Sequence, residues 1–490
     1  MKETFPRIIG CFAIILLFML AINPASAQLI SLKSIPVAEG DQFNVFPDKN
    51  LGMGGISLAL NDLLHDPFVN PAKGARIRGM QIFSSPTFYS ISNENGSART
   101  LPVGLLNGSG RYFGGLSMSV QQLEKHSLDG IQPLYAPEIL SEQASNNMYA
   151  FGMLGRNVLD DSTFAAASIF WSDLGALEGV DLLFPRSRKI DQSGNLLDVR
   201  LGLLRELGAG RSLEALLLYN RLDMTYNVFY LDGIRFDMAG SIVDYLRREK
   251  NQDRTNTYGI HVGYMQPVGE NGWKAGSIFT FNYKTHPKIP NYELMNIPRD
   301  PGNTRAFNVG LGFSNHMENT TFGIDLIYEP IWSKTWAEAA SAVTTPSGKV
   351  ILPGDKAVEN HFRFSDYLVK IGIRRETDKA GFQLGMQVRS IRYRLEQYNY
   401  IDEFQRQQTE HWLEWSPSWG IIIKFPEFQL NYVGRVTTGT GQPGIVSNWF
   451  AAVDRAAFGA DYIVAPAGSL TLQESLVFIN QLTVSIPLNH

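Results

Sequence analysis

The chain is poor in cysteine and histidine. Its 490 residues contain one cysteine, Cys11, and 8 histidines. Cys11 lies in an amino-terminal stretch that we expect to be removed, so the remaining chain can form no disulfide, no cysteine-ligated metal site and no thiol nucleophile. The histidines are not spaced as a ligand cluster. We therefore expect no metal and no other cofactor.

The chain also lacks an excess of positive charge. It has 43 Lys+Arg against 47 Asp+Glu, a formal net charge of −4. This balance excludes a polybasic nucleic-acid-binding protein, because few cations remain to neutralise phosphates. With 18% charged and 44% hydrophobic residues, the chain does not have the composition of a disordered protein. It contains no nucleophile elbow, no His-Glu-x-x-His and no P-loop, so we expect no enzyme activity.

Only one long apolar run is present, and it lies at the start. Lys2 and Arg7 precede the apolar run Ile8–Ile22, and Ala25–Ala27 provides a small-x-small cleavage pattern. We interpret residues 1–27 as a cleavable export signal. No window of 18 apolar residues follows, which leaves a soluble exported protein or a transmembrane β-barrel.

The rest of the chain alternates between apolar and polar residues. In one run Phe382, Leu384, Met386 and Val388 alternate with Gln383, Gly385, Gln387 and Arg389. A period of two places one set on each face of a β-strand. Seven short turn sequences separate such runs: Asn107–Gly110, Asn157–Asp161, Gly208–Gly210, Gly269–Gly272, Asn315–Asn319, Thr377–Lys379 and Pro426. Longer loops are expected at Glu124–Asn146, Gly175–Asn195, Leu231–Asp253, Pro287–Asn303, Ser333–His361 and Gly439–Glu474.

Short turns at one end and long loops at the other are typical of outer-membrane barrels. Counting the runs, with Ile77–Ile91 first and Ser475–Pro487 last, gives up to sixteen strands. The run Thr100–Leu106 is a poor strand sequence, so fourteen strands is an equally good count. The expected fold is all-β: a transmembrane antiparallel β-barrel of about 14 strands (14–16). A soluble β-sandwich array or propeller is the alternative, since alternation alone also fits those folds.

One block before the first strand resembles a known family. Leu51–Ala59 is glycine-rich and apolar, Asn61 and Asp62 follow it, and Asn70-Pro71-Ala72 comes next. This order resembles the amino-terminal hatch of the FadL superfamily. That superfamily includes transporters of long-chain fatty acids and aromatic hydrocarbons, and also the shuttle barrel of type IX secretion. The resemblance divides the chain into a signal peptide (1–27), a hatch that plugs the barrel (28–76) and the barrel itself (77–490).

The resemblance also implies a function. It implies a fourteen-stranded barrel, entry of an apolar ligand from outside, and lateral exit through a kink in the third strand. The third run of this chain is Arg111–Leu123, and its Gly114-Gly115 pair is the candidate lateral gate. The expected hatch residues serve structure rather than catalysis: Gly52, Gly54, Gly55, Asn61, Asp62, Asn70, Pro71 and Ala72.

Six charged residues fall on positions that we expect to face the lumen: Asp325, Glu329, Lys370, Arg374, Arg389 and Arg435. Two interpretations are a salt-bridged, hydrated interior and a lining that selects the ligand or contacts the hatch. We expect a protein of the cell outer membrane, surrounded by outer-membrane lipid, that takes up hydrophobic small molecules. The alternative is a non-transporting barrel that serves as a partner or shuttle in protein secretion or envelope assembly. An apolar pocket under the loops favours transport, and a wide polar lumen favours the partner role.

Overall fold

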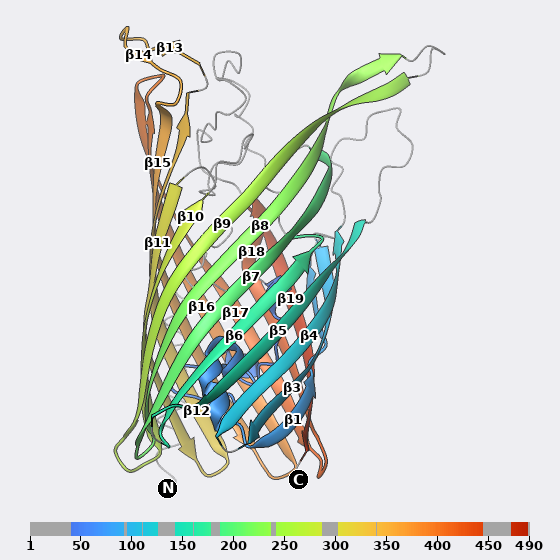
Figure 1. Cartoon of the computed structure of the whole chain (residues 1–490), viewed down its shortest axis with the longest axis vertical. Coiled ribbons are helices and arrows are strands. Elements are labelled where there is room, and N and C mark those ends of the chain that lie inside the picture. The colour runs from blue at the N-terminus through green and yellow to red at the C-terminus, as the bar shows by residue number, and fades with distance from the viewer. Residues whose placement is uncertain are drawn as a thin grey trace.

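The alternating runs form long antiparallel strands that tilt strongly around a closed wall (Figure 1). The structure, a computed structural model, describes residues 41–92, 96–109, 111–125, 143–159, 161–177, 187–236, 242–286, 302–339, 341–443 and 472–488. The expected signal peptide, residues 28–40 of the expected hatch and much of the expected long loops lie outside the described residues. The wall strands are β1 (Gly79–Ser84), β2 (Thr87–Ile91), β3 (Gly96–Ser109), β4 (Tyr112–Lys125), β5 (Gln143–Asn157), β6 (Thr163–Leu174), β7 (Ser187–Gly208), β8 (Arg211–Phe236), β9 (Ile242–Val268), β10 (Trp273–His286), β11 (Gly302–Met317), β12 (Thr320–Glu338), β15 (Lys356–Glu376), β16 (Ala380–Asn399), β17 (Phe404–Lys424), β18 (Gln429–Pro443) and β19 (Leu472–Leu488).

The wall closes because the first strand position pairs with both β3 and β19. β1 and β2 share this position, and Ser85 and Pro86 separate them. The barrel therefore has sixteen strand positions. The direct count of runs reached this number, whereas the expectation of about fourteen, which the resemblance implied, is wrong. The closed barrel also makes the soluble sandwich or propeller interpretation wrong.

All seven expected short turns join consecutive strands of the wall, so this part of the prediction is confirmed. Two of the expected long loops are partly wrong, because strands occupy much of them. β7 begins at Ser187, inside the loop expected at Gly175–Asn195. In the loop expected at Leu231–Asp253, β8 continues to Phe236 and β9 begins at Ile242. At the same end, a small hairpin of β13 (Val343–Thr344) and β14 (Val350–Ile351) lies between β12 and β15.

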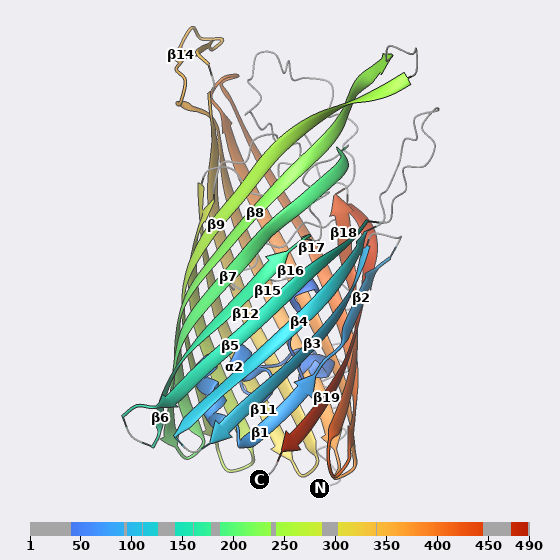
Figure 2. The ribbon, with the colours of Figure 1, turned by 45° about the vertical axis from the view of Figure 1, so that its right-hand side comes forward.

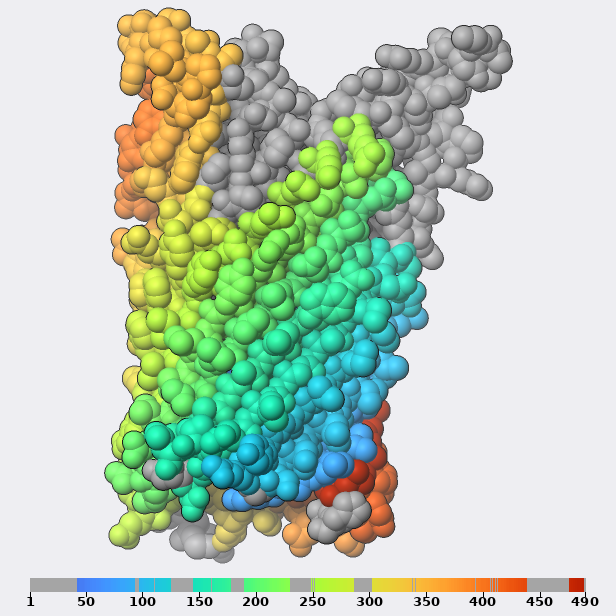
Figure 3. Space-filling view, in the orientation of Figure 1, coloured from blue at the N-terminus to red at the C-terminus, as the bar shows by residue number. Residues whose placement is uncertain are grey.

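Side chains alternate between the two faces of the wall. On β4, Leu116, Met118 and Val120 face outward with 65%, 63% and 54% of their surface exposed, while Ser117 and Ser119 between them are buried. The same pattern gives outward apolar residues on β5, β6, β7 and β8. These four strands lie side by side on the face of the molecule seen in Figure 3. The outer surface of the barrel is therefore a band of exposed aliphatic side chains.

The chain before β1 lies inside the barrel (Figure 2). We call residues 41–77 the N-terminal segment. It consists of four short helical pieces and the turns between them: η1 (Asp41–Phe43), η2 (Leu51–Met53), α2 (Asp66–Val69) and η3 (Pro71–Arg76). Hydrogen bonds join it to the inner faces of β12, β15, β16 and β17. Within the described residues, no helix has the length and apolar character needed to cross a membrane.

Candidate functional site

The glycine-rich turn of the N-terminal segment fits closely against the wall. η2 ends at Gly54 and Gly55, whose φ angles of 75° and 71° are in the left-handed region that favours glycine. The wall provides glycines at the same place, Gly372 on β15 and Gly385 on β16. A Cβ on Gly372 would collide with the carbonyl oxygen of Met53, and one on Gly385 with the backbone of Met53 and Gly54. Backbone therefore packs directly on backbone here.

Charged side chains of the wall hold the backbone after this turn. The Asp325 carboxylate accepts hydrogen bonds from the N–H groups of Ser57 (2.8 Å) and Leu58 (3.2 Å). Lys370, opposite Asp325 in the β12–β15 register, donates to the carbonyl of Gly55 over 2.8 Å. Asp325 is fully buried. Because hydrogen bonds to a charged group are stronger than neutral ones, this pair is a firm attachment point.

The Asn-Pro-Ala sequence forms a second attachment point, four strand positions away around the wall. Asn70 is buried; its Oδ1 accepts from the Ala72 N–H (3.1 Å), and its Nδ2 donates to Glu214 on β8 (2.9 Å). Lys73 forms an ion pair with the same carboxylate over 3.0 Å. Arg200 on β7 donates to the carbonyls that end α2. Pro71 starts η3, where its missing N–H costs nothing.

Burial changes the ionisation of the segment's own charges. It raises the pKa of the Asp66 carboxyl to about 6, against a partial opposing effect of Lys73. Burial and the neighbouring Asp48 raise the pKa of Asp62, whose carboxylate accepts from the N–H of Lys49 (2.6 Å) and of Leu64 (3.0 Å). For Lys73, burial favours the neutral form, but Asp66 and Glu214 outweigh it and raise its pKa.

The remaining residues expected from the sequence lie at the same interior or beside it. Gly52 packs on Gly420 of β17 and the side chain of Gln383. Asn61 accepts from Arg76 at an exposed position of the segment. Glu329 and Arg389 form a buried ion pair across the lumen face. Arg374 pairs with Glu376 over 3.2 Å, and Arg435 stands opposite Ser418, whose hydroxyl accepts from Gly54.

Apolar side chains line much of the interior beyond the segment. The outer side of the segment presents Phe46 and Phe68, stacked at 4.1 Å, against Phe151 and Phe170 of the wall. Inward residues of eight strands continue this lining: Tyr149, Leu174, Leu196, Met224, Tyr226, Val228, Ala306, Ile331, Phe362, Phe364, Ile391 and Leu395. Buried polar side chains, such as those of Asn308, Thr335 and Gln397, lie on inward positions of the same strands. The interior therefore contains a cluster of buried apolar side chains packed next to the N-terminal segment.

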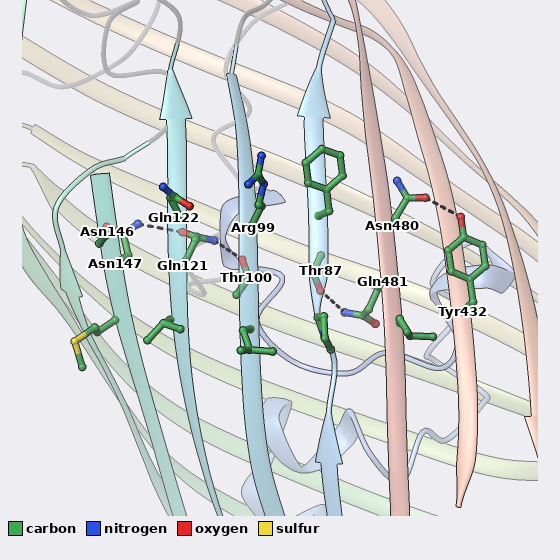
Figure 4. A pocket seen from close by; sticks show the side chains of 16 residues that line it. Thr87, Arg99, Thr100, Gln121, Gln122, Asn146, Asn147, Tyr432, Asn480 and Gln481 are labelled. Atoms are coloured by element: carbon green, nitrogen blue, oxygen red, sulfur yellow. Dashed lines mark hydrogen bonds between the residues drawn. The ribbon is translucent and has the colours of Figure 1, made fainter. Parts of the chain in front are cut away.

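The wall strand is interrupted between β1 and β2, at Ser85 and Pro86. Pro86 has no N–H to donate, and the register places Ser85 opposite Pro102 of β3, which also lacks one. The hydroxyl of Ser85 is buried. A pocket of about 690 Å³ covers this place, lined by residues of β2–β5, β18 and β19 (Figure 4). By contrast, β4 pairs with β3 and β5 through Gly114 and Gly115 without a register shift.

A row of amides crosses the wall at the level of this pocket. Gln121 donates to Thr100 (2.8 Å) and to the carbonyl of Gln42 in the N-terminal segment (2.7 Å), and it accepts from Asn147 (3.0 Å) (Figure 4). On the other side of the Ser85–Pro86 break, Gln481 donates to Thr87 and to the carbonyl of Phe46. The segment is thus tied to both sides of this break.

Sequence reasoning missed several of these residues. Gln121, Asn147 and Glu214 look like ordinary polar residues of a strand until the segment is seen against them. The inward glycines of the wall gave a usable signal, because a glycine at an inward position leaves room for another backbone. The alternation of residues along a strand identified the face on which such a glycine lies, but not the backbone that packs against it.

No protein-family model and no curated protein matches the chain. Among solved structures, it is similar to a Pseudomonas aeruginosa FadL homologue: 13% identity, a TM-score of 0.45, and coverage of 90% of this chain and 98% of the other. It is also similar to the Ralstonia pickettii toluene transporter TbuX, with 11% identity, a TM-score of 0.39, and coverage of 91% and 100%. For the Pseudomonas putida toluene transporter TodX the values are 10%, 0.38, 90% and 99%. The functional proposal below rests on the chain's own residues.

Proposed function

We propose that the protein is an outer-membrane channel for passive uptake of hydrophobic small molecules, of the fatty-acid or aromatic-hydrocarbon type. The observation that carries this proposal is the cluster of apolar side chains in the interior, with Tyr226, Phe362 and Phe364 on the wall and Phe46 on the N-terminal segment. A hydrated ion pore needs a polar lining, whereas an apolar molecule gains roughly 25 cal/mol per Å² of surface that it removes from water here.

The outer surface supports placement in a membrane. A soluble barrel would expose this band of aliphatic side chains to water, and contiguous apolar patches of that extent are rare on soluble proteins. A membrane barrel presents such a band to lipid. The outer membrane is the proposed location, reached with the signal peptide of residues 1–27.

The N-terminal segment acts as a plug in this proposal. The segment is held by Asp325 on β12 and, eight strand positions away around the wall, by Gln121 on β4, so it spans the lumen. A ligand inside the barrel then has no straight path through the base. We propose that residues 28–76 form the plug and that it stays in place during transport.

The ligand leaves through the wall. Gly114-Gly115 was the gate expected from the sequence, and an opening there must break a continuous ladder. The Ser85–Pro86 break has fewer ladder hydrogen bonds to lose, and the pocket lies on it. We therefore favour the Ser85–Pro86 break over the glycine pair as the lateral exit.

The experiment is uptake of a labelled long-chain fatty acid or aromatic hydrocarbon by cells with equal surface levels of each variant. Replacing Phe362 and Phe364 by asparagine makes the lining polar and should lower uptake on the order of tenfold. Replacing both by leucine is the control and should preserve most of it. All variants should fractionate with the outer membrane and run heat-modifiably. Recovery of the parent protein as a soluble monomer, or equal uptake by both double mutants, contradicts the proposal.

One feature favours the alternative role as a partner in secretion or envelope assembly. The β13–β14 hairpin is an ordered projection on the long-loop side, packed through Ile351 on Ile401. Glu403, in the turn between β16 and β17, accepts hydrogen bonds from Thr345 and Ser347 of the hairpin. A rigid surface of this kind suits a protein partner. No uptake by the parent protein, combined with loss of secretion on deleting residues 341–353, would support this role instead.

A further inference from the structure

A row of cations lies on the outward face of four adjacent strands. Arg305 on β11, Trp332 on β12, Arg363 on β15 and Arg394 on β16 are direct cross-strand neighbours, in that order. Lys334 follows one step further along β12. We call Arg305, Arg363, Arg394 and Lys334 the cation row. Neighbouring strands lie roughly 4.8 Å apart, so the row spans about 15 Å of the outer surface.

The cation row carries more positive charge than its surroundings neutralise. Arg394 pairs with Glu396 over 2.8 Å, and Lys334 shares the carboxylate of Glu359 with Lys356. The guanidinium of Arg363 stands 6.0 Å from the ring of Trp332. Among the described residues, neither Arg305 nor Arg363 forms an ion pair, and both side chains are exposed. Two guanidinium groups are therefore free to bind an anion.

The row lies directly beyond the apolar band of the same strands. Tyr328 and Tyr367 stack at 4.9 Å on the side of the short turns, and Leu326 and Val369 follow below them. Tyr367 and Leu326 are 55% and 46% exposed. Passing from the short turns toward the long loops, the outward face is thus aliphatic, then aromatic, then cationic.

This order matches the parts of a phosphorylated lipid. Its acyl chains would lie along Leu326 and Val369, and its phosphates would reach the cations. Arginine suits this contact because its planar group donates two parallel hydrogen bonds to a phosphate. We propose that the cation row binds the phosphate groups of an anionic lipid in the outer leaflet. The proposal rests on the placement of the barrel in an outer membrane.

Three arginines elsewhere on the outward face have acidic partners. Arg99 on β3 pairs with Glu124 over 3.4 Å, and Arg221 and Arg254 share the carboxylate of Asp223, at 2.8 and 2.9 Å. These three arginines are exposed and carry the same charge as those of the row. They provide a matched control, because their removal changes the net charge by the same amount at positions with local acidic partners.

The experiment compares two triple variants of the full mature protein in an uncharged detergent. One has Arg305→Gln, Arg363→Gln and Arg394→Gln, and the other has Arg99→Gln, Arg221→Gln and Arg254→Gln. Each is titrated at low salt with bis-phosphorylated lipid A, with dephosphorylated lipid A and with inorganic phosphate. The row variant should bind bis-phosphorylated lipid A more weakly than the parent by on the order of a hundredfold. The control variant should lose far less.

Several results would overturn the inference. Equal affinity of the two triple variants for bis-phosphorylated lipid A shows that the row is not the binding site. Equal binding of dephosphorylated lipid A shows that phosphate is not recognised. Competition by inorganic phosphate at the same concentration shows a simple anion site without a lipid. Heat-modifiable migration of each variant verifies that the barrel is folded. A barrel that fractionates with the outer membrane but binds no lipid A refutes this inference alone, whereas a protein absent from that membrane refutes the proposed function.

Discussion

Removal of the Asp325 carboxylate should release the N-terminal segment from the wall. Asp325→Ala leaves the N–H groups of Ser57 and Leu58 without their acceptor at a part-buried place. It also leaves Lys370 without the opposite charge across the β12–β15 pair. An unsatisfied buried donor costs roughly 1–3 kcal/mol, so the two part-buried donors together weaken the attachment by at most about 2–6 kcal/mol.

This loss corresponds to a rise of up to roughly thirtyfold to twenty-thousandfold in the population of released segment, at about 1.4 kcal/mol per factor of ten. The measurement is thiol labelling of an Ala59→Cys reporter, because Ala59 is only 1% exposed while the segment is attached. The labelling is clean because the only native cysteine, Cys11, lies in the expected signal peptide. Conductance in planar bilayers gives a second reading, since a released segment opens the base.

The matched control is Asp173→Ala, which removes an exposed carboxylate on the outward face of β6. It should change neither labelling nor conductance. If the Asp325→Ala variant labels at Ala59→Cys at the parent rate and shows no added conductance, Asp325 does not hold the segment and the second attachment point at Glu214 suffices alone.

Two further predictions concern pH and the exit route. Because burial raises the pKa of Asp66 from 3.8 to about 6, attachment of the segment should be strongest below about pH 4 and weaken as the pH rises through 6. Asp66→Asn should remove this dependence, which amounts to at most about 3 kcal/mol, and thiol labelling across pH 4–8 measures it. A disulfide between Ser85→Cys and Pro102→Cys should lock the wall break and lower uptake reversibly, whereas Gly114→Val with Gly115→Val lowers uptake only if the glycine pair is the gate.

The control for the disulfide is a Thr304→Cys and Ser333→Cys pair on β11 and β12, where the two native hydroxyls are 2.8 Å apart. Directly opposed strand residues are close enough for a disulfide in both pairs. Reductant should restore uptake by the variant with Ser85→Cys and Pro102→Cys. The control variant should take up ligand equally well with its disulfide formed or reduced. Full uptake while the disulfide between positions 85 and 102 is formed would show that the ligand does not leave through the Ser85–Pro86 break.

The fold was largely predictable because turns and alternation are local signals. Glycine, asparagine and aspartate at seven short turns fixed where strands reverse, and a period of two fixed which face each residue takes. The predicted number of about fourteen strands was wrong because it followed the family resemblance, although the runs themselves allowed sixteen. Thr100–Leu106 seemed a poor strand because it contains Pro102 and Gly104. In the structure Gly104 is needed there, since a side chain would collide with the ring of Phe83.

The candidate site was less predictable because it depends on pairs that are distant in sequence. The alternation of residues along a strand predicts that Asp325 and Lys370 face the lumen. It does not predict that their partners are Ser57, Leu58 and Gly55. Those contacts join residues more than 260 positions apart, and they exist only because Gly372 lets the backbone approach. The apolar cluster of the interior had no local signal either, since Phe362 and Phe364 alternate like any other strand residues.

The position of the wall break could not be predicted from the sequence of one strand, because it depends on how neighbouring strands pair. A glycine pair weakens a strand through its own flexibility, so Gly114-Gly115 was the natural choice from one strand alone. In the closed barrel, a break depends on the donors that are missing on both sides of a strand. Pro86 faces β19, where its carbonyl accepts from the Leu482 N–H, and Pro102 of β3 lies opposite Ser85. The two prolines therefore remove one donor from each of the two ladders that border Ser85–Pro86, and the amides of Gln121 and Gln481 tie the segment on either side of it. A lateral exit controlled by the N-terminal segment follows from that pairing.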